Sequence, residues 1–307
     1  MKVLFFLAPV AAFGVSLIGQ ESARYAGPII DMHQHAEWEM WSSTRLCFPA
    51  PCTPAPTKAQ SLAELKPRTL RAMEENNIVM AVVSAPPRYV LPWTQGEGSR
   101  WLTGIQLNNP ADVPIDELRQ LFASGRAQVM GELAFQYEGI PIDDPSVDPI
   151  LALAESLDVP VHVHVLGLGG EPAFPIELGN PTRVATVMRR HPNLRIYLEN
   201  AAWPFLEEVT SLMYQYPGVY ADISTIAHLF PRDVFHAYLQ GLVRNGLGKR
   251  LMFGSDQMLW PEVIGEVVDA INSAEFLSLE QKADIFYNNA ARFLRLDPAQ
   301  IERHHEG

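Results

Sequence analysis

The sequence predicts a single (β/α)8 TIM barrel with a long insertion after the first strand, and three observations favour this fold class. Short apolar runs alternate with helical patterns along most of the chain, as expected for parallel βαβ units. Eight such runs are present, which is the number of strands in a TIM barrel. The length of 307 residues, 48% of them hydrophobic, suits one barrel and its core.

The elements follow in a regular order. Residues 29–35 form the first predicted strand, and the long stretch 36–60, rich in proline and tryptophan, comes next. Loops of this length inside a compact domain are usually functional. Ser61 then caps a predicted helix that continues to Met73. The other predicted strands are 78–83, 101–107, 128–133, 159–165, 194–198, 219–223 and 250–253, and the helices are 115–123, 149–157, 182–190, 204–214, 233–244 and 261–271.

The first 23 residues have the pattern of a secretory leader. Lys2 precedes the apolar run 3–19, and three polar residues follow that run. We expect cleavage between Gly19 and Ala23, a barrel domain over 24–307, and a secreted or periplasmic location. An uncleaved anchor and a buried first helix are the alternatives. No later segment is long and apolar enough to predict a membrane span.

The formal net charge of −12 argues against a nucleic-acid partner, because phosphate groups require a basic surface. No local cluster of basic residues changes this conclusion. We therefore expect a small-molecule partner, and no membrane contact beyond the leader.

Cys47 and Cys52 are the only cysteines, and they bracket Phe-Pro-Ala-Pro. In an exported protein they are candidates for a disulfide. Two free thiols are the alternative, and a thiolate metal site is disfavoured because no further cysteine would complete it.

The first predicted strand ends in a candidate metal motif. Successive side chains of a strand alternate between its faces, so Asp31, His33 and His35 are expected on one face. The carboxyl end of a barrel strand is where enzymes of this fold keep their chemistry. Neutral imidazole is a common metal ligand, and we expect Asp31 to orient one of the rings through its other nitrogen.

Two further strand ends add to this motif. The fifth predicted strand carries His162 and His164, and His164 is nearer the barrel mouth. We take His164 as a ligand and His162 as a deeper hydrogen-bonded neighbour. Asp256 follows the eighth strand, where its carboxylate would bind a metal or accept a proton. Such nitrogen and oxygen donors with an open position suit a hydrolytic Zn²⁺ site, and Mn²⁺ or Fe²⁺ would tolerate them as well.

Taken together, these motifs resemble the amidohydrolase superfamily, in particular the amidohydrolase-related branch that includes aminocarboxymuconate semialdehyde decarboxylase. The resemblance rests on residues 31–35, 160–164 and 253–256, and on residues 289–294, which look like the C-terminal Asn-Ala-x-Arg helix of the branch. It implies one metal per chain and allows for a homodimer, since barrels of this branch are often dimers. The implied metal ligands are His33, His35, His164 and Asp256.

One departure from the branch concerns the sixth strand, where its members usually carry a histidine. Here Asn200 takes that place. Asparagine cannot shuttle a proton near neutral pH, although it can donate a hydrogen bond to an oxyanion. Glu199 offers a carboxylate, but strand alternation points it to the other face unless the chain bends. His228, after the seventh strand, is another candidate base; an exposed loop histidine is the alternative reading.

Two more residues are candidates for substrate or supporting contacts. Glu132 looks like the Gly-Glu that often ends the fourth strand in the branch. It would form hydrogen bonds within the barrel mouth or contact the substrate. Arg88, after the second strand, would meet a substrate carboxylate.

We therefore expect a metal-dependent hydrolase that acts on an amide, ester or lactone bond of a small molecule. A metal-activated water would attack, Asp256 would accept its proton, and Asn200 would assist the metal at the oxyanion. Non-oxidative decarboxylation of an aromatic or enoic acid is one alternative. A barrel that binds metal or ligand without catalysis is another.

Overall fold

The computed structural model describes residues 23–36, 58–167 and 174–306. The predicted leader and the pair Cys47 and Cys52 lie outside the described residues, so the leader and the disulfide stay predictions. Among the helices of the described part, none combines the length and the apolar character needed to cross a bilayer.

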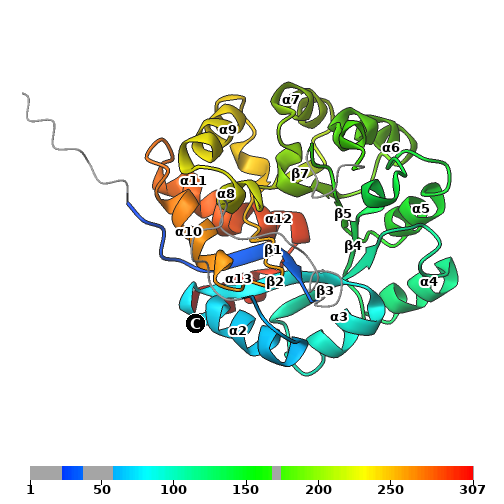
Figure 1. Cartoon of the computed structure of the whole chain (residues 1–307), viewed down its shortest axis with the longest axis horizontal. Coiled ribbons are helices and arrows are strands. Elements are labelled where there is room, and N and C mark those ends of the chain that lie inside the picture. The colour runs from blue at the N-terminus through cyan, green and yellow to red at the C-terminus, as the bar shows by residue number, and fades with distance from the viewer. Residues whose placement is uncertain (1–22, 37–57, 168–173, 307) are drawn as a thin grey trace, which may run out of the picture.

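Eight parallel strands form one sheet in the order β1 to β8, and helices surround them on the outside (Figure 1). The predicted TIM barrel is therefore confirmed. Each predicted apolar run contains one strand, although the strands from β5 onward are shorter than the runs. The strands are β1 (Ile29–His35), β2 (Ile78–Ala85), β3 (Trp101–Leu107), β4 (Val129–Leu133), β5 (Val161–Val163), β6 (Ile196–Leu198), β7 (Val219–Asp222) and β8 (Leu251–Met252).

The helices match the predicted pattern, with additions. At the start of α2, the Ser61 side chain accepts a hydrogen bond from Glu64 N, as its capping role requires. The sequence pattern did not indicate α3, whose Pro87 stands in the first turn, where the missing N–H costs nothing. The helices are α2 (Leu62–Glu75), α3 (Pro87–Thr94), α4 (Ile115–Ala123), α5 (Asp148–Ser156), α6 (Val184–Arg190), α7 (Leu206–Gln215), α8 (Ile226–Leu229), α9 (Arg232–Arg244), α10 (Val263–Asn272), α11 (Leu279–Ala283), α12 (Asn289–Leu294) and α13 (Pro298–Glu306).

Backbone hydrogen bonds join β1 to the chain that follows β8. Met32 N donates to Phe253 O at 2.9 Å, and Asp256 N donates to His33 O at 2.9 Å. These bonds bring the last strand against the first one and bring the residues after β8 to the carboxyl end of β1. The closure of the barrel therefore places Asp256 beside the predicted histidine motif.

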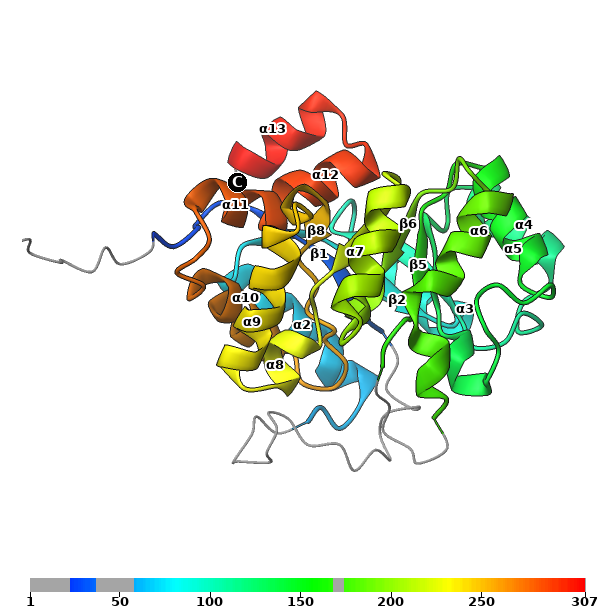
Figure 2. The same ribbon diagram turned by 90° about the horizontal axis from the view of Figure 1, so that it is seen from above.

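The opposite end of the barrel is closed by the C-terminal helices. Figure 2 shows α12 and α13 together at one end of the molecule. Asn289 Nδ2 donates to Leu251 O at 2.6 Å, at the start of β8. Phe293 of α12 joins a buried apolar cluster with Tyr197 and Met32. Apolar side chains therefore fill this end, and the polar side chains of the strand ends gather at the other.

Strand β1 contains a bulge that changes which of its side chains share a face. Its register against β2 shifts between Asp31 and Gln34, and a bulge breaks the strict alternation of a strand. The Asp31 carboxylate accepts hydrogen bonds from Gln34 Nε2 at 2.9 Å and from Ser255 Oγ at 2.6 Å. The expectation that Asp31 orients an imidazole ring is therefore wrong: it ties β1 to the chain after β8.

Candidate metal centre

Three of the predicted ligands come together at the carboxyl ends of the strands. His35 Nε2 lies 3.1 Å from His33 Nε2 and 3.0 Å from Asp256 Oδ1. All three residues are buried, and one ligand atom from each lies within 4.8 Å of the other two. This arrangement allows His33, His35 and Asp256 to hold one ion.

The fourth predicted ligand, His164, lies in a neighbouring donor set. Its Nδ1 is 2.9 Å from Glu132 Oε1 and 2.7 Å from Glu199 Oε2. The ligand atoms of these three residues again lie within 4.8 Å of one another. Glu132 also faces the first set, with its Oε2 3.7 Å from His35 Nε2. The four predicted ligands thus fall in two adjacent donor sets, and a third group of His33, His162 and Glu199 overlaps both.

Glu199 reaches this position because the chain bends directly after β6. A short 3₁₀ turn spans Glu199–Ala202, and Asn200 within it has a φ of 53°, so strand alternation no longer applies. Asn200 instead lies behind the cluster. Its Nδ2 donates to Glu199 Oε1 at 2.7 Å, and its Oδ1 accepts from Ser224 Oγ at 3.0 Å. The chain therefore bends as the position of Glu199 in the site requires, and the Asn200 amide supports Glu199.

Asp222, at the end of β7, belongs to the site although the sequence reasoning missed it. Its Oδ2 lies 3.5 Å from His33 Nδ1 and 3.4 Å from His162 Nε2. Burial favours the protonated acid, but the hydrogen bonds to these histidines outweigh it and lower the pKa of Asp222 below its usual range. A carboxylate behind a ligand imidazole fixes its orientation. An acidic residue at the end of the seventh predicted strand was the signal that could have revealed it.

The close approach of histidines and carboxylates shifts the pKa values of the cluster. Burial alone would lower the pKa of His164, but the carboxylates of Glu199 and Glu132 raise it to about 10. Burial raises the pKa of Glu199 to about 8, against the effect of His164. For His33, burial is likewise outweighed by Asp256 and Glu199, so its pKa is raised well above the usual value. A metal that binds here must displace such protons, so metal binding depends on pH.

The donor chemistry fits a divalent metal ion. The two sets offer imidazole nitrogens and carboxylate oxygens, which Zn²⁺, Mn²⁺ and Fe²⁺ all accept. Among the residues that the structure describes, the buried Nε2 atom of His164 has no hydrogen-bond partner, and neither has either ring nitrogen of His162. His33, His35 and Asp256 would hold one ion at the barrel rim.

The remaining candidates lie around this cluster. His228, on α8, is partly buried. Burial lowers the pKa of His228 to about 4, and the charges of Asp256 and His33 also affect this pKa. His228 is therefore near the site and uncharged at neutral pH. Arg88 is exposed at the start of α3, with its guanidinium 4.5 Å from the centroid of the Tyr89 ring. Its contact with a substrate carboxylate stays a prediction.

Aromatic rings border His164, and the sequence reasoning did not single them out. The Tyr137 ring centroid lies 4.7 Å from that of His164 and 5.2 Å from that of Phe174. Tyr137 is 44% exposed, so it stands between the buried cluster and solvent. These rings form part of the wall around the site.

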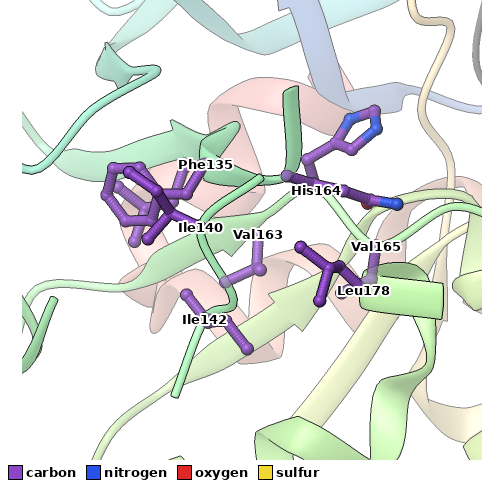
Figure 3. Close-up of a pocket in the computed structure, with 9 residues that line it drawn as sticks. Phe135, Ile140, Ile142, Val163, His164, Val165 and Leu178 are labelled. Carbon is purple, nitrogen blue, oxygen red and sulfur yellow. The ribbon is translucent and has the colours of Figure 1, made fainter. Parts of the chain in front are cut away.

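A small cavity lies on the other side of β5. Its volume is about 10 Å³, which holds at most about one water molecule. Figure 3 shows the His164 imidazole pointing away from the apolar side chains that line the cavity, among them Ile140 and Ile142. The cavity is a packing gap behind the strand and has no room for a substrate.

Comparison with known proteins gives one family match and one curated relative. A family model described as Amidohydrolase matches residues 30–296. Protein fluG of Emericella nidulans is 22% identical over 215 residues, which cover 64% of this chain. The chain matches 24% of the length of that relative.

Three solved structures share the fold. An uncharacterized TIM-barrel protein from Bordetella bronchiseptica has a TM-score of 0.64 at 17% identity, covering 87% of this chain and 98% of that one. A probable 2-pyrone-4,6-dicarboxylic acid hydrolase from Acinetobacter baumannii, with citric acid bound, has a TM-score of 0.60 at 14% identity, covering 87% and 99%. A dihydroxybenzoic acid decarboxylase from Polaromonas sp. JS666, with bound manganese and the inhibitor 2-nitroresorcinol, has a TM-score of 0.62 at 14% identity, covering 90% and 99%.

Proposed function

The chain belongs to the Amidohydrolase family, and from this premise we propose that it is a metal-dependent hydrolase of an amide, ester or lactone bond in a small molecule. The observation that carries the proposal is the buried set of His33, His35 and Asp256 at the carboxyl ends of the barrel strands. A divalent metal held there, with Zn²⁺ favoured and Mn²⁺ or Fe²⁺ as alternatives, supplies a Lewis acid and lowers the pKa of water toward neutrality.

Asp256 is the group placed to accept a proton. Burial works against its ionisation, but His33 and His35 outweigh burial and hold the pKa of Asp256 below its usual value. The carboxylate is therefore ionised at neutral pH. It takes the proton of the attacking water and passes it to the leaving group. Thr225 Oγ1 donates a hydrogen bond to Asp256 Oδ2 and fixes its orientation.

The supporting residues act behind these groups. Asp222 and Ser224 lie against His33 Nδ1, with Ser224 Oγ at 3.1 Å, and orient its other ring nitrogen toward the site. Asn200 holds Glu199 against His164. Because the Asn200 amide donates its hydrogen bond to Glu199, in this proposal Asn200 positions Glu199 and does not contact an oxyanion.

Decarboxylation of an aromatic or enoic acid is the second candidate, because the fold is shared with a dihydroxybenzoic acid decarboxylase as well as with a probable pyrone hydrolase. A basic side chain that reaches the substrate carboxylate would support this reaction, and Arg88 at the start of α3 is the residue to examine. The test below separates the two reactions.

The test is turnover of esters, lactones, amides and aromatic acids by the metal-loaded protein in ¹⁸O-labelled water. Hydrolysis places one ¹⁸O in the acid product, and Asp256→Asn abolishes it. Release of CO₂ without labelled product supports decarboxylation instead, with Arg88→Ala as its matched variant. Stoichiometric metal without turnover of any substrate supports a binding protein.

We propose further that the protein is exported after removal of the leader, and that it forms a homodimer. Mass spectrometry of protein from the native host should find the first residue between Gln20 and Arg24. An intact Met1 removes the proposal of a cleaved leader. Light scattering after size-exclusion chromatography gives the oligomeric state.

A further inference from the structure

We propose that Tyr137, together with Phe174, determines substrate specificity by forming a subsite for an apolar group beside His164. The inference rests on the proposed function, because it assigns the part of the substrate that is attached to the reacting carbonyl. The ring centroid of Tyr137 lies 4.7 Å from that of His164 and 5.2 Å from that of Phe174. The Phe174 ring itself lies 6.2 Å from His164, inclined by 81°. A group that packs against these two rings is therefore held next to the polar cluster.

Part of the Tyr137 side chain remains open to solvent at this position. Tyr137 is 44% exposed, whereas the neighbouring His164 is 4% exposed. Ile176, whose N–H donates to Phe174 O at 3.0 Å, is 54% exposed. Apolar side chains that are exposed beside a polar site are typical of ligand-binding surfaces. A substrate with an apolar group gains binding energy when it covers them, because this area is removed from water.

The short helix that follows β4 fixes the position of Tyr137. A 3₁₀ helix spans Phe135–Glu138, and it begins two residues after the strand that carries Glu132. Within this helix, Tyr137 N donates to Ala134 O at 3.2 Å, and the Phe135 side chain is buried. The Tyr137 ring is thus in place before a substrate binds, which lowers the entropic cost of binding.

Gln136 joins the segment of Phe174 to the same short helix. Its buried amide accepts from Leu166 N at 3.4 Å and donates to Leu166 O at 2.9 Å and to Pro175 O at 3.3 Å. Leu166 lies two residues after His164, and Pro175 directly follows Phe174. One side chain therefore holds the chain after β5 and the segment of Phe174 against the helix of Tyr137. Gln136 is a positioning residue for the subsite.

The chemistry of the subsite differs from that of the donor sets and defines a class of substrate. The donor sets present imidazole and carboxylate groups to the reacting carbonyl, whereas Tyr137 and Phe174 present ring faces without formal charge. Aromatic and apolar walls with a few polar groups are the usual composition of small-molecule sites. The substrate should therefore carry a bulky apolar group on its carbonyl carbon, and an acetyl compound should leave the subsite empty.

The experiment compares two uncharged amides, cyclohexanecarboxamide and acetamide, which differ in the apolar group on the carbonyl carbon. Saturation-transfer NMR titrations give both Kd values for the full chain, metal-free and loaded with zinc. Wild type should bind cyclohexanecarboxamide at least about tenfold more tightly, since each fully buried CH₂ group strengthens binding about fourfold. Tyr137→Ala should lose most of this preference without a change in the Kd of acetamide. Tyr137→Phe should keep it, because the ring face is retained.

Tyr214→Ala is the matched control, because Tyr214 is a 66% exposed tyrosine on α7, and it should bind both amides as wild type does. The absence of a preference in wild type, or a preference that Tyr137→Ala retains, overturns the subsite. Neither result affects the proposed function, which fails separately if wild type incorporates no ¹⁸O. Circular dichroism checks that each variant is folded. If Tyr137→Ala does not fold, Phe174→Ala takes its place, with the same expected loss of preference.

Discussion

The imidazole of His162 stacks on the ring of Tyr197, with centroids 4.2 Å apart and planes inclined by 6°. Tyr197 is itself fixed, because its hydroxyl donates to Met32 O at 2.9 Å inside the barrel. Burial, reinforced by the charge of His33, lowers the pKa of His162 despite the nearby Asp222 carboxylate. His162 is therefore held as a neutral packing residue within the barrel, while His164 stands at the rim.

This arrangement predicts different metal losses for the two histidines of the fifth strand. His164→Ala should reduce bound metal far more than His162→Ala, because the His164 ring lies against Glu132 and Glu199 while the His162 ring stacks on Tyr197. Inductively coupled plasma mass spectrometry of the purified variants measures the metal per chain. Equal losses would contradict the assignment of His164 as the ligand.

Restoring the histidine that the branch carries after the sixth strand should not improve the enzyme. Asn200 is fully buried, and its Oδ1 accepts from Thr225 N at 2.6 Å and from Ser224 Oγ. Asn200→His breaks these bonds and overfills the space, so the free energy of unfolding should fall by about 2–4 kcal/mol. Urea denaturation measures this, with Asn193→His at an exposed position as control. A gain in activity would refute the positioning role of Asn200.

His228 should make the protein less stable in mild acid. Burial lowers its pKa from 6.5 to about 4, so between these pH values the unfolded chain binds a proton that the folded chain does not. Stability therefore falls as the pH falls from 6.5 to 4, by up to about 3 kcal/mol. Unfolding curves of wild type and His228→Gln should diverge over this range. Parallel pH profiles would show that His228 does not contribute.

Gly131, in β4, is a position where a side chain should not fit. Its φ is 141°, and a Cβ atom there would lie 2.5 Å from His162 O. Gly131→Ala should lower the free energy of unfolding by about 3 kcal/mol and weaken metal binding, because Glu132 is the next residue. Gly218→Ala is the matched control, since its Cβ would meet Leu194 O at an ordinary 3.6 Å. Equal melting temperatures for the two variants would refute the steric argument.

The fold could be predicted because each strand of a parallel barrel is a short apolar run, and runs of this kind are visible without knowledge of their partners. The same local rule placed His33, His35 and Asp256 at strand ends. Asp222 follows the same rule, because it lies near the end of the seventh predicted strand, and the structure shows its carboxylate beside His33.

Other parts of the site depend on departures from regular geometry that the sequence does not display. Asp31 was assigned to the histidine face by strand alternation, but the bulge in β1 moves it beside Gln34 and Ser255. Glu199 reaches the site only through a bend, which strand alternation leaves open and which the positive φ of Asn200 creates. The division of the predicted ligands into two donor sets depends on distances across the barrel, which no local pattern reports.

The hydrogen bonds that join β1 to the chain after β8 bring together residues that are far apart in the sequence. His33 emerges from the ribosome well before Asp256, which donates its N–H to His33 O. Until the last strand is in place, the first donor set contains two histidines and no acid. We therefore expect tight metal binding only after the barrel has closed, because the donor set of His33, His35 and Asp256 is incomplete before then.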